Sequence, residues 1–173
     1  VTAERSLVEK AAAKNLFARA LRGPVKPPPG LADMIEDQLR AAALGALGLA
    51  RKAGGVTTGS AKVDAAIRAN RAVAVIHATE AAADGIRKLA QARHAVVMAG
   101  GEEVPSYKLF SEAELGLALG GTNVIHAAVL AGQTGEMVLK RLDALARYRG
   151  EDPEDRRSQA ASDAGLETAK DME

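Results

Sequence analysis

The sequence predicts an α/β protein: a three-layer α/β/α sandwich of about four strands, with an additional N-terminal helical segment. Short apolar runs alternate with helical patterns over residues 56–149, which is typical of a sheet covered by helices on both faces. Of the 173 residues, 47% are hydrophobic, enough to bury a sizeable core.

Changes in composition divide the chain into four parts. Residues 1–23 carry a helical apolar pattern with an expected break near Asn15, and residues 24–30 form a proline-rich linker that no helix crosses. Residues 31–150 are predicted as the sandwich domain. Residues 151–173 are polar and acidic, which predicts a disordered tail.

The sandwich domain is expected to open with a long helix. Apolar residues keep a helical period from residue 31 toward residue 49, and Gly54 suits the position just after a helix end. Arg51 and Lys52 then occupy the last turn, where cations are favoured by the helix dipole. Gly45 and Gly48 either let another element approach closely or mark a break between two helices.

The remaining elements are expected to alternate. Strands are predicted at residues 56–59, 72–79, 94–100 and 123–131, and helices at residues 60–70, 81–92, 112–119 and 134–149.

Composition narrows the classes of function. Residues 1–52, 53–150 and 151–173 carry net charges of +4, +2 and −5, so that a mildly basic body precedes an acidic tail. A basic body suits a polyanionic partner. Aromatic residues make up only 2%, which counts against stacking of single-stranded bases on aromatic platforms.

Targeting and redox signals are also absent from the sequence. There is no cysteine, and the first residues lack the apolar core of a signal peptide. The longest small-apolar run, residues 41–50, is too short to span a bilayer. We therefore expect a cytoplasmic protein without a membrane partner.

No motif predicts catalysis. His77, His94 and His126 fall in or beside predicted strands, where a structural role is the more common one, and no metal-ligand spacing accompanies them. The glycine pairs form neither a dinucleotide fingerprint nor a phosphate loop with its lysine. The sequence thus predicts no enzyme, no cofactor and no metal site.

The turn "TTGSAK" is the first candidate binding segment. Gly59 permits close backbone approach, Thr58 or Ser60 is expected to cap the next helix, and the free N–H groups of its first turn suit an anion. Lys62 opposes the helix dipole there, which a bound anion would explain. An ordinary capped helix with one surface lysine remains the alternative.

The second candidate segment is "ELGLALGGTNV". A helix is expected to end at Gly120 and Gly121, with Thr122 and Asn123 leading into the last strand. An ordinary glycine-terminated loop is the alternative. In a sandwich of this order the two segments can converge at one end, with Arg51 and Lys52 nearby.

These segments carry a family resemblance. "GLARKAG", Gly59 followed by "VDAAI", and "LGLALG" before the last strand resemble the ribosomal L-seven-A-e superfamily of kink-turn RNA-binding proteins over residues 41–149. The resemblance implies an α/β/α sandwich that clamps bent RNA between two segments. It places the RNA-binding residues at Arg51, Lys52, Gly59, Ser60, Ala61, Lys62, Leu119, Gly120, Gly121, Thr122, Asn123 and Val124.

Departures from the kink-turn pattern modify that expectation. Ala61, Lys62 and Ala65 stand where kink-turn binders carry an amide, a carboxylate and a lysine. Phosphate or backbone recognition is then the expected mode of binding, and the pattern is closer to the bacterial YlxQ-type branch. Residues 1–23 resemble the C-terminal part of the YlxR-type nucleic-acid-binding family.

The favoured function is therefore non-catalytic binding of structured RNA, with ribosomal or kink-turn-like RNA as the candidate partner. A protein-interaction module of the translation or transcription machinery is the main alternative, and a small-molecule enzyme is a more distant one.

Overall fold

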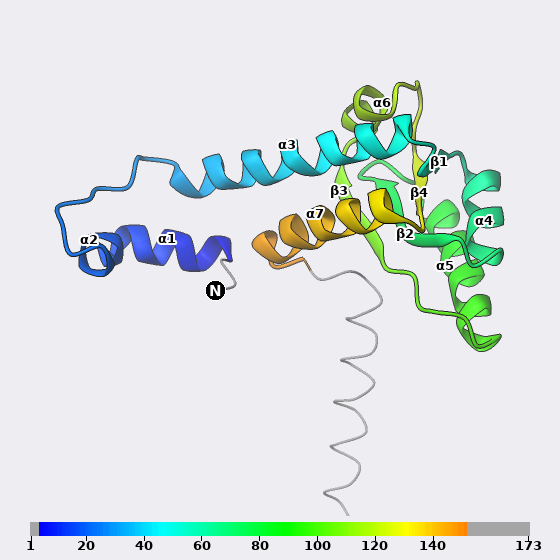
Figure 1. The fold of residues 1–173 in the computed structure, drawn as a ribbon, viewed down its shortest axis with the longest axis horizontal. Helices are drawn as coiled ribbons and strands as arrows, with labels where there is room; N and C mark the ends of the chain where they lie inside the picture. The colour runs from blue at the N-terminus through cyan, green and yellow to red at the C-terminus, as the bar shows by residue number, and fades with distance from the viewer. Residues whose placement is uncertain (1–3, 152–173) are drawn as a thin grey trace, which may run out of the picture.

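The computed structural model describes residues 4–151, in which helices and strands alternate from α3 onward (Figure 1). The elements are α1 (Arg5–Ala13), α2 (Leu16–Ala20), α3 (Leu31–Lys52), β1 (Val56–Thr58), α4 (Ser60–Arg68), β2 (Ala72–Ala78), α5 (Ala83–Met98), β3 (Ser106–Phe110), α6 (Glu112–Leu119), β4 (His126–Leu130) and α7 (Gln133–Arg149).

The four strands form one mixed sheet in the order β1-β4-β2-β3. β4 is antiparallel to β1 and β2, whereas β3 is parallel to β2. Successive residues of β2 face opposite layers: Ala74 and Ile76 pack with α3, α6 and α7, and Val75 packs with α4 and α5. Helices therefore cover both faces of the sheet, and the predicted three-layer sandwich is confirmed (Figure 1).

α3 ends as the sequence predicts. Gly54 has φ 75°, the N–H of Gly55 donates to the carbonyl of Ala50 at 2.7 Å, and the N–H of Gly54 donates to Arg51 at 3.1 Å. This pair of hydrogen bonds is the Schellman motif, which satisfies carbonyls left free at a helix end.

The two glycines within α3 do not break it, because the helix is continuous for 22 residues. A Cβ at Gly48 would lie 3.1 Å from the carbonyl oxygen of Ala118, whereas a Cβ at Gly45 would meet nothing within 4 Å. Gly48 is thus the position of close approach, to α6.

The strand expected at residues 94–100 is wrong, since α5 continues to Met98. Leu89, Ala92 and Val96 repeat at helical spacing and are buried together, which holds this segment as a helix. His94 therefore lies on a helix and is exposed. The third strand is instead β3, which the apolar pattern did not single out.

The first helices form an N-terminal arm, residues 5–30, that projects along α3 away from the sheet (Figure 1). Asn15 has φ 50° and separates α1 from α2, as the sequence predicts. Val8 of α1 packs with Ala32 of α3 and Tyr148 of α7 in a small separate cluster. The hydroxyl of Tyr148 donates to the carbonyl of Ala32 at 2.9 Å, which joins α7 to the start of α3 where Val8 packs.

Within residues 4–151, none of the helices combines the length and apolarity that crossing a bilayer requires. The acidic tail predicted for residues 151–173 lies outside the described part of the chain, apart from Glu151.

Candidate nucleic-acid interface

The two candidate segments meet at one edge of the sheet. Thr58, the last residue of β1, pairs with Ala127 near the start of β4. The N–H of Gly59 then donates to the carbonyl of His126 at 3.0 Å. The turn that opens α4 and the loop that precedes β4 are therefore neighbours, 60 residues apart in the sequence. We call this edge, residues 59–62 and 119–124, the rim.

Gly59 lets the chain turn from β1 into α4. It is the residue before the helix, with φ 94°, a value that side chains other than glycine rarely adopt. Contrary to the expectation for Thr58 or Ser60, no side chain caps this helix. The first-turn N–H groups of α4 therefore face outward without a capping oxygen, and a Cβ at Gly59 would meet nothing within 4 Å.

Lys62 adds a positive charge in this first turn. Its side chain is exposed, and no ion pair to it occurs among residues 4–151. The nearest acid along α4, Asp64, instead accepts from the Arg68 guanidinium at 2.8 Å. Lys62 and the free amides thus present positive potential at the same end of α4, an arrangement that suits a phosphate.

The second half of the rim is a tight loop after α6. Gly120 has φ 66° and closes the helix, and the N–H of Gly121 donates to Gly116 at 3.0 Å. A Cβ at Gly116 would lie only 2.7 Å from the carbonyl oxygen of Gly121, so backbone packs directly on backbone here. β4 begins at His126 rather than near Asn123, because Asn123 adopts a left-handed φ of 58°.

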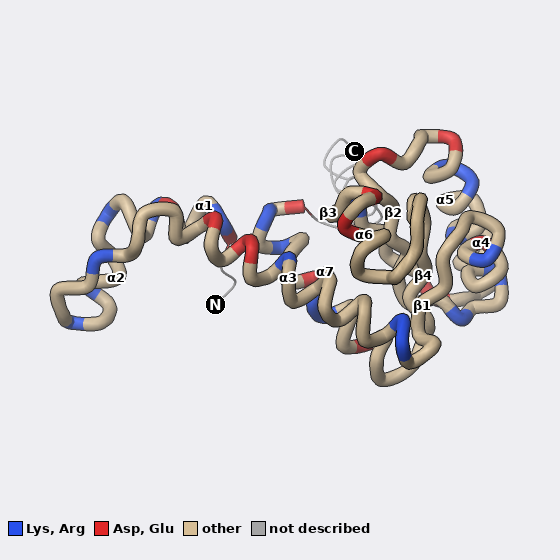
Figure 2. Tube along the Cα trace, turned by 90° about the horizontal axis from the view of Figure 1, so that it is seen from above, with Lys and Arg blue, Asp and Glu red and all other residues tan. Residues whose placement is uncertain are grey.

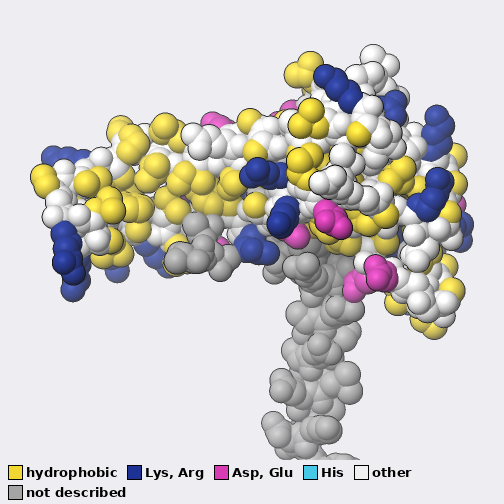
Figure 3. Space-filling model, in the orientation of Figure 1, with side chains coloured by type: hydrophobic (Ala, Val, Ile, Leu, Met, Phe, Trp, Pro, Cys, Tyr) yellow, Lys and Arg dark blue, Asp and Glu magenta, His cyan; other side chains and the backbone are white. Residues whose placement is uncertain are grey.

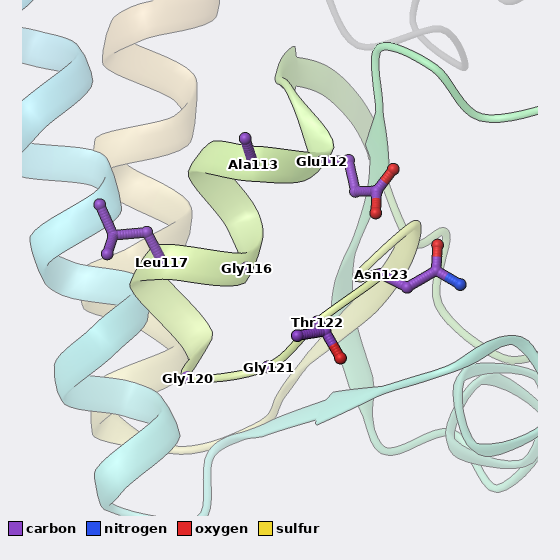
Figure 4. Close-up of a pocket in the computed structure, with 8 residues that line it drawn as sticks. All are labelled: Glu112, Ala113, Gly116, Leu117, Gly120, Gly121, Thr122 and Asn123. Carbon is purple, nitrogen blue, oxygen red and sulfur yellow. The ribbon is translucent and has the colours of Figure 1, made fainter.

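The ends of this loop are buried and its middle is exposed. Leu119 and Val124 pack into the core, so their side chains anchor the loop. Gly121, Thr122 and Asn123 lie between them at the surface, beside an open groove along α6. Figure 4 shows Thr122 and Asn123 extending to the side of the loop opposite Leu117.

Arg51 and Lys52 stand apart from the turn at Gly59. They precede β1 and Gly59 follows it, so a strand of three residues, about 10 Å, separates them. The guanidinium of Arg51 donates to the carbonyl of Val56 at 3.2 Å, which directs it to the start of β1. Lys52 lies one turn beyond Gly48 on the same helix face, beside the end of α6.

Carboxylates share the same edge of the sheet. Glu80 follows β2 and accepts from the backbone N–H of Glu112 at 2.9 Å and from the hydroxyl of Thr79 at 3.0 Å. The bond from Glu112 lowers the pKa of Glu80 and keeps it ionised. The negative charge of Glu80 makes this side of the rim less favourable for a polyanion than the Lys62 side.

Beneath the rim lies a buried histidine pair that sequence reasoning did not connect. The Nδ1 atoms of His77 and His126 are 2.8 Å apart, and their rings meet edge to face at 5.0 Å. His77 Nε2 is buried without a hydrogen-bond partner among the described residues. Burial, followed by the neighbouring His126, lowers the pKa of His77 to about 3.

Gly85 makes room for this pair. A Cβ at Gly85 would lie 2.6 Å from Nε2 of His126, so α5 approaches the ring closely. No group of three or more His, Asp or Glu side chains that could hold a metal ion occurs within residues 4–151. The two histidines are 49 residues apart, and no local pattern could have linked them.

Comparison with known proteins agrees with this architecture. The model of the ribosomal protein L7Ae/L30e/S12e/Gadd45 family matches residues 41–138. A Bacillus halodurans protein of unknown function aligns with a TM-score of 0.52 and 22% identity, over 60% of this chain and 98% of that one. The Giardia lamblia 15.5kD RNA binding protein aligns with a TM-score of 0.48 and 21% identity, over 62% and 90%.

No curated protein sequence matches the chain. The likeness to the Bacillus halodurans structure bears on the fold alone. The family model, in contrast, covers more than half of the chain and includes both segments of the rim. This protein therefore belongs to the ribosomal protein L7Ae/L30e/S12e/Gadd45 family.

Proposed function

We propose that this chain is a non-catalytic RNA-binding protein that holds structured RNA at the rim. Membership of a family of ribosomal-type proteins supports RNA as the ligand. The observation that carries the proposal is the Gly59–His126 hydrogen bond at 3.0 Å, because it joins the uncapped helix start to the glycine loop in one surface.

Recognition at this surface would act mainly on the RNA backbone. The rim offers exposed amides, the Lys62 ammonium and the side chains of Thr122 and Asn123. Ala61 and Ala65 provide no group that reads a base edge. We therefore propose structured RNA, of ribosomal or kink-turn-like form and in the cytoplasm, recognised by shape and phosphate position.

Replacing Lys62 tests the proposal. Lys62→Ala should weaken binding to a kink-turn RNA and to a straight duplex of equal length, because one phosphate contact is lost. The slope of log affinity against log salt should fall by about 0.7 to 0.9. Fluorescence anisotropy at several salt concentrations measures both quantities.

The matched control is Lys88→Ala on α5, an exposed lysine that is not part of the rim. It should leave the affinity and the salt slope at the wild-type values. Equal affinities and slopes for the wild-type protein and Lys62→Ala would reject the rim as the RNA surface.

A protein partner is the second candidate, favoured by one observation. Leu117 on α6 is 89% exposed and Leu49 on α3 is 60% exposed, on two helices that pack together. Large exposed apolar side chains often mark interaction surfaces. Capture of a defined protein that survives nuclease and 1 M salt, and is lost in Leu117→Ser, would favour this function over RNA binding.

A further inference from the structure

The free end of the N-terminal arm is strongly basic. Residues 10–30 contain five cationic side chains and no Asp or Glu. They are Lys10, Lys14, Arg19, Arg22 and Lys26, which we call the basic tip. Figure 2 shows Lys and Arg alone toward this end of the arm, beyond the acidic residues where α1 meets α3.

The cations of the basic tip are uncompensated. All five are exposed, and none has an ion pair or side-chain hydrogen bond within residues 4–151. The acids nearby are used elsewhere: Arg5 binds Glu9, Asp33 and Glu36, and Glu36 also binds Arg40 and Arg149. The carboxylates of Glu9, Asp33 and Glu36 are thus paired with arginines outside the tip, and the tip keeps its positive charge.

The tip is held far from the rim. α3 has 22 residues and is about 33 Å long. α2 and the proline connector lie toward the N-terminal end of α3, whereas the rim lies near its C-terminal end, where α6 packs against Gly48 (Figure 1). Because the arm is packed against α3 and Tyr148 at its base, α3 acts as a spacer between two positive surfaces.

We propose that the basic tip is a second contact surface for RNA phosphates, occupied by the same molecule that binds the rim. Cationic residues that follow one another along the chain without intervening carboxylates suit a polyanion with regularly spaced charges. The identification of that anion as RNA rests on the proposed function. To touch both surfaces, a single RNA must span about 33 Å, the length of α3. The tip and the rim together therefore favour long or folded RNAs over short ones.

An anionic membrane is the other polyanion that a basic tip can meet. Leu16, Leu21 and Val25 are exposed among the cations, at 42%, 67% and 38%. Figure 3 shows hydrophobic side chains beside Lys and Arg at this end of the molecule. However, α2 has only five residues and offers no continuous apolar face of the kind that lies in a lipid interface. The geometry therefore favours RNA.

The test compares two triple variants of the full chain. Arg19→Gln/Arg22→Gln/Lys26→Gln removes part of the basic tip. Lys140→Gln/Arg141→Gln/Arg147→Gln removes the same charges from α7, where all three are exposed and unpaired within the described residues. RNA duplexes of about 10 and about 40 base pairs serve as probes, because an A-form duplex of the first length is shorter than the roughly 33 Å of α3 and one of the second length is far longer.

The wild-type protein should bind the long duplex more tightly than the short one, by more than the larger number of binding positions on the long duplex accounts for. The tip triple should lose this advantage, and its salt slope on the long duplex should fall by about 2 to 3. The α7 triple should keep both. Circular dichroism and melting temperature should match for all three proteins, because the six side chains are exposed and have no ion pair or side-chain hydrogen bond within residues 4–151.

Two outcomes overturn the proposal. Equal losses in both triples would show that overall charge, not the tip, determines affinity. Unchanged RNA binding by the tip triple, with loss of binding to vesicles containing phosphatidylserine, would assign the tip to membranes. The rim is tested separately: if Lys62→Ala has no effect and the tip triple weakens binding, the rim fails and the tip stands.

Discussion

His77 and His126 carry an energetic cost, because both are titratable side chains buried in the core. In the folded state both rings are buried, so a proton added to either has no water around it. One neutral ring donates to the other, and the bond at 2.8 Å satisfies one nitrogen of each. This pair lies directly below Gly59, since His126 supplies the carbonyl that Gly59 binds.

Acid should therefore destabilise the protein through His77. Its folded pKa of about 3 lies below the ordinary value of 6.5, so between these values the unfolded chain holds a proton that the folded chain does not. The free energy of unfolding then falls by about 1.4 kcal/mol per pH unit below pH 6.5. When the pH falls from 7 to 5, the free energy of unfolding of His77→Gln should decrease by about 2 kcal/mol less than that of the wild type. Urea titrations at the two pH values measure this difference.

His94→Gln is the control for this prediction, because His94 is exposed on α5. Its unfolding free energy should change with pH as that of the wild type does. A His77→Gln protein with the full wild-type pH dependence would mean that the buried pair is not the acid-sensitive group.

At the scale of the element, α3 carries two glycines with different surroundings. Glycine in a helix interior costs roughly 1 kcal/mol relative to alanine. Gly45 has nothing within 4 Å of an added Cβ, whereas at Gly48 the carbonyl of Ala118 would lie at 3.1 Å. The same substitution therefore has different consequences one turn apart.

Gly45→Ala should raise the free energy of unfolding by about 0.5 to 1 kcal/mol, because it restricts the unfolded chain without a clash. Gly48→Ala should raise the free energy of unfolding by at least about 0.5 kcal/mol less than Gly45→Ala does, because α6 has to move by a few tenths of an ångström. Urea titrations of both variants measure the difference. Equal stabilisation would show that the contact between α3 and α6 is loose enough to absorb a methyl group.

At the scale of the whole molecule, Glu36 joins the arm to the sandwich. It accepts hydrogen bonds from Arg5 of α1 at 2.7 Å and from Arg149 of α7 at 2.8 Å, and pairs with Arg40 at 3.4 Å. Although burial opposes ionisation, the bonds from Arg5 and Arg149 lower the pKa of Glu36. One carboxylate thus holds three helices, and its side chain is only 16% exposed.

Glu36→Gln should release the arm, because three guanidinium groups lose their shared charge. We expect a loss of roughly 1 to 3 kcal/mol in local stability. Hydrogen exchange should speed up for the amides of α1 and remain unchanged for those of α5. The control is Asp37→Asn, at an exposed neighbouring acid, which should leave the hydrogen exchange of α1 and α5 unchanged. Equal exchange of α1 in both variants would show that the ion pairs of Glu36 do not hold the arm.

Much of this protein is determined locally, by its sequence alone. Apolar residues at spacings of three and four define α3, α4 and α7, and Asn15 and Gly54 end helices where the backbone needs left-handed φ values. β2 is a buried run of the length that a strand requires. These features depend on neighbours within one or two turns, so periodicity and capping chemistry are sufficient to predict them.

Tertiary structure decided what local patterns leave open. The run at residues 94–98 suits either a strand or a helix until Leu89, Ala92 and Val96 are buried together against the sheet. The meeting of Gly59 with His126, the separation of Arg51 from Gly59, and the histidine pair all depend on the strand order. The pairs that β4 makes with β1 and β2 join residues 49 to 73 positions apart, and no pattern in the sequence shows which strands become neighbours.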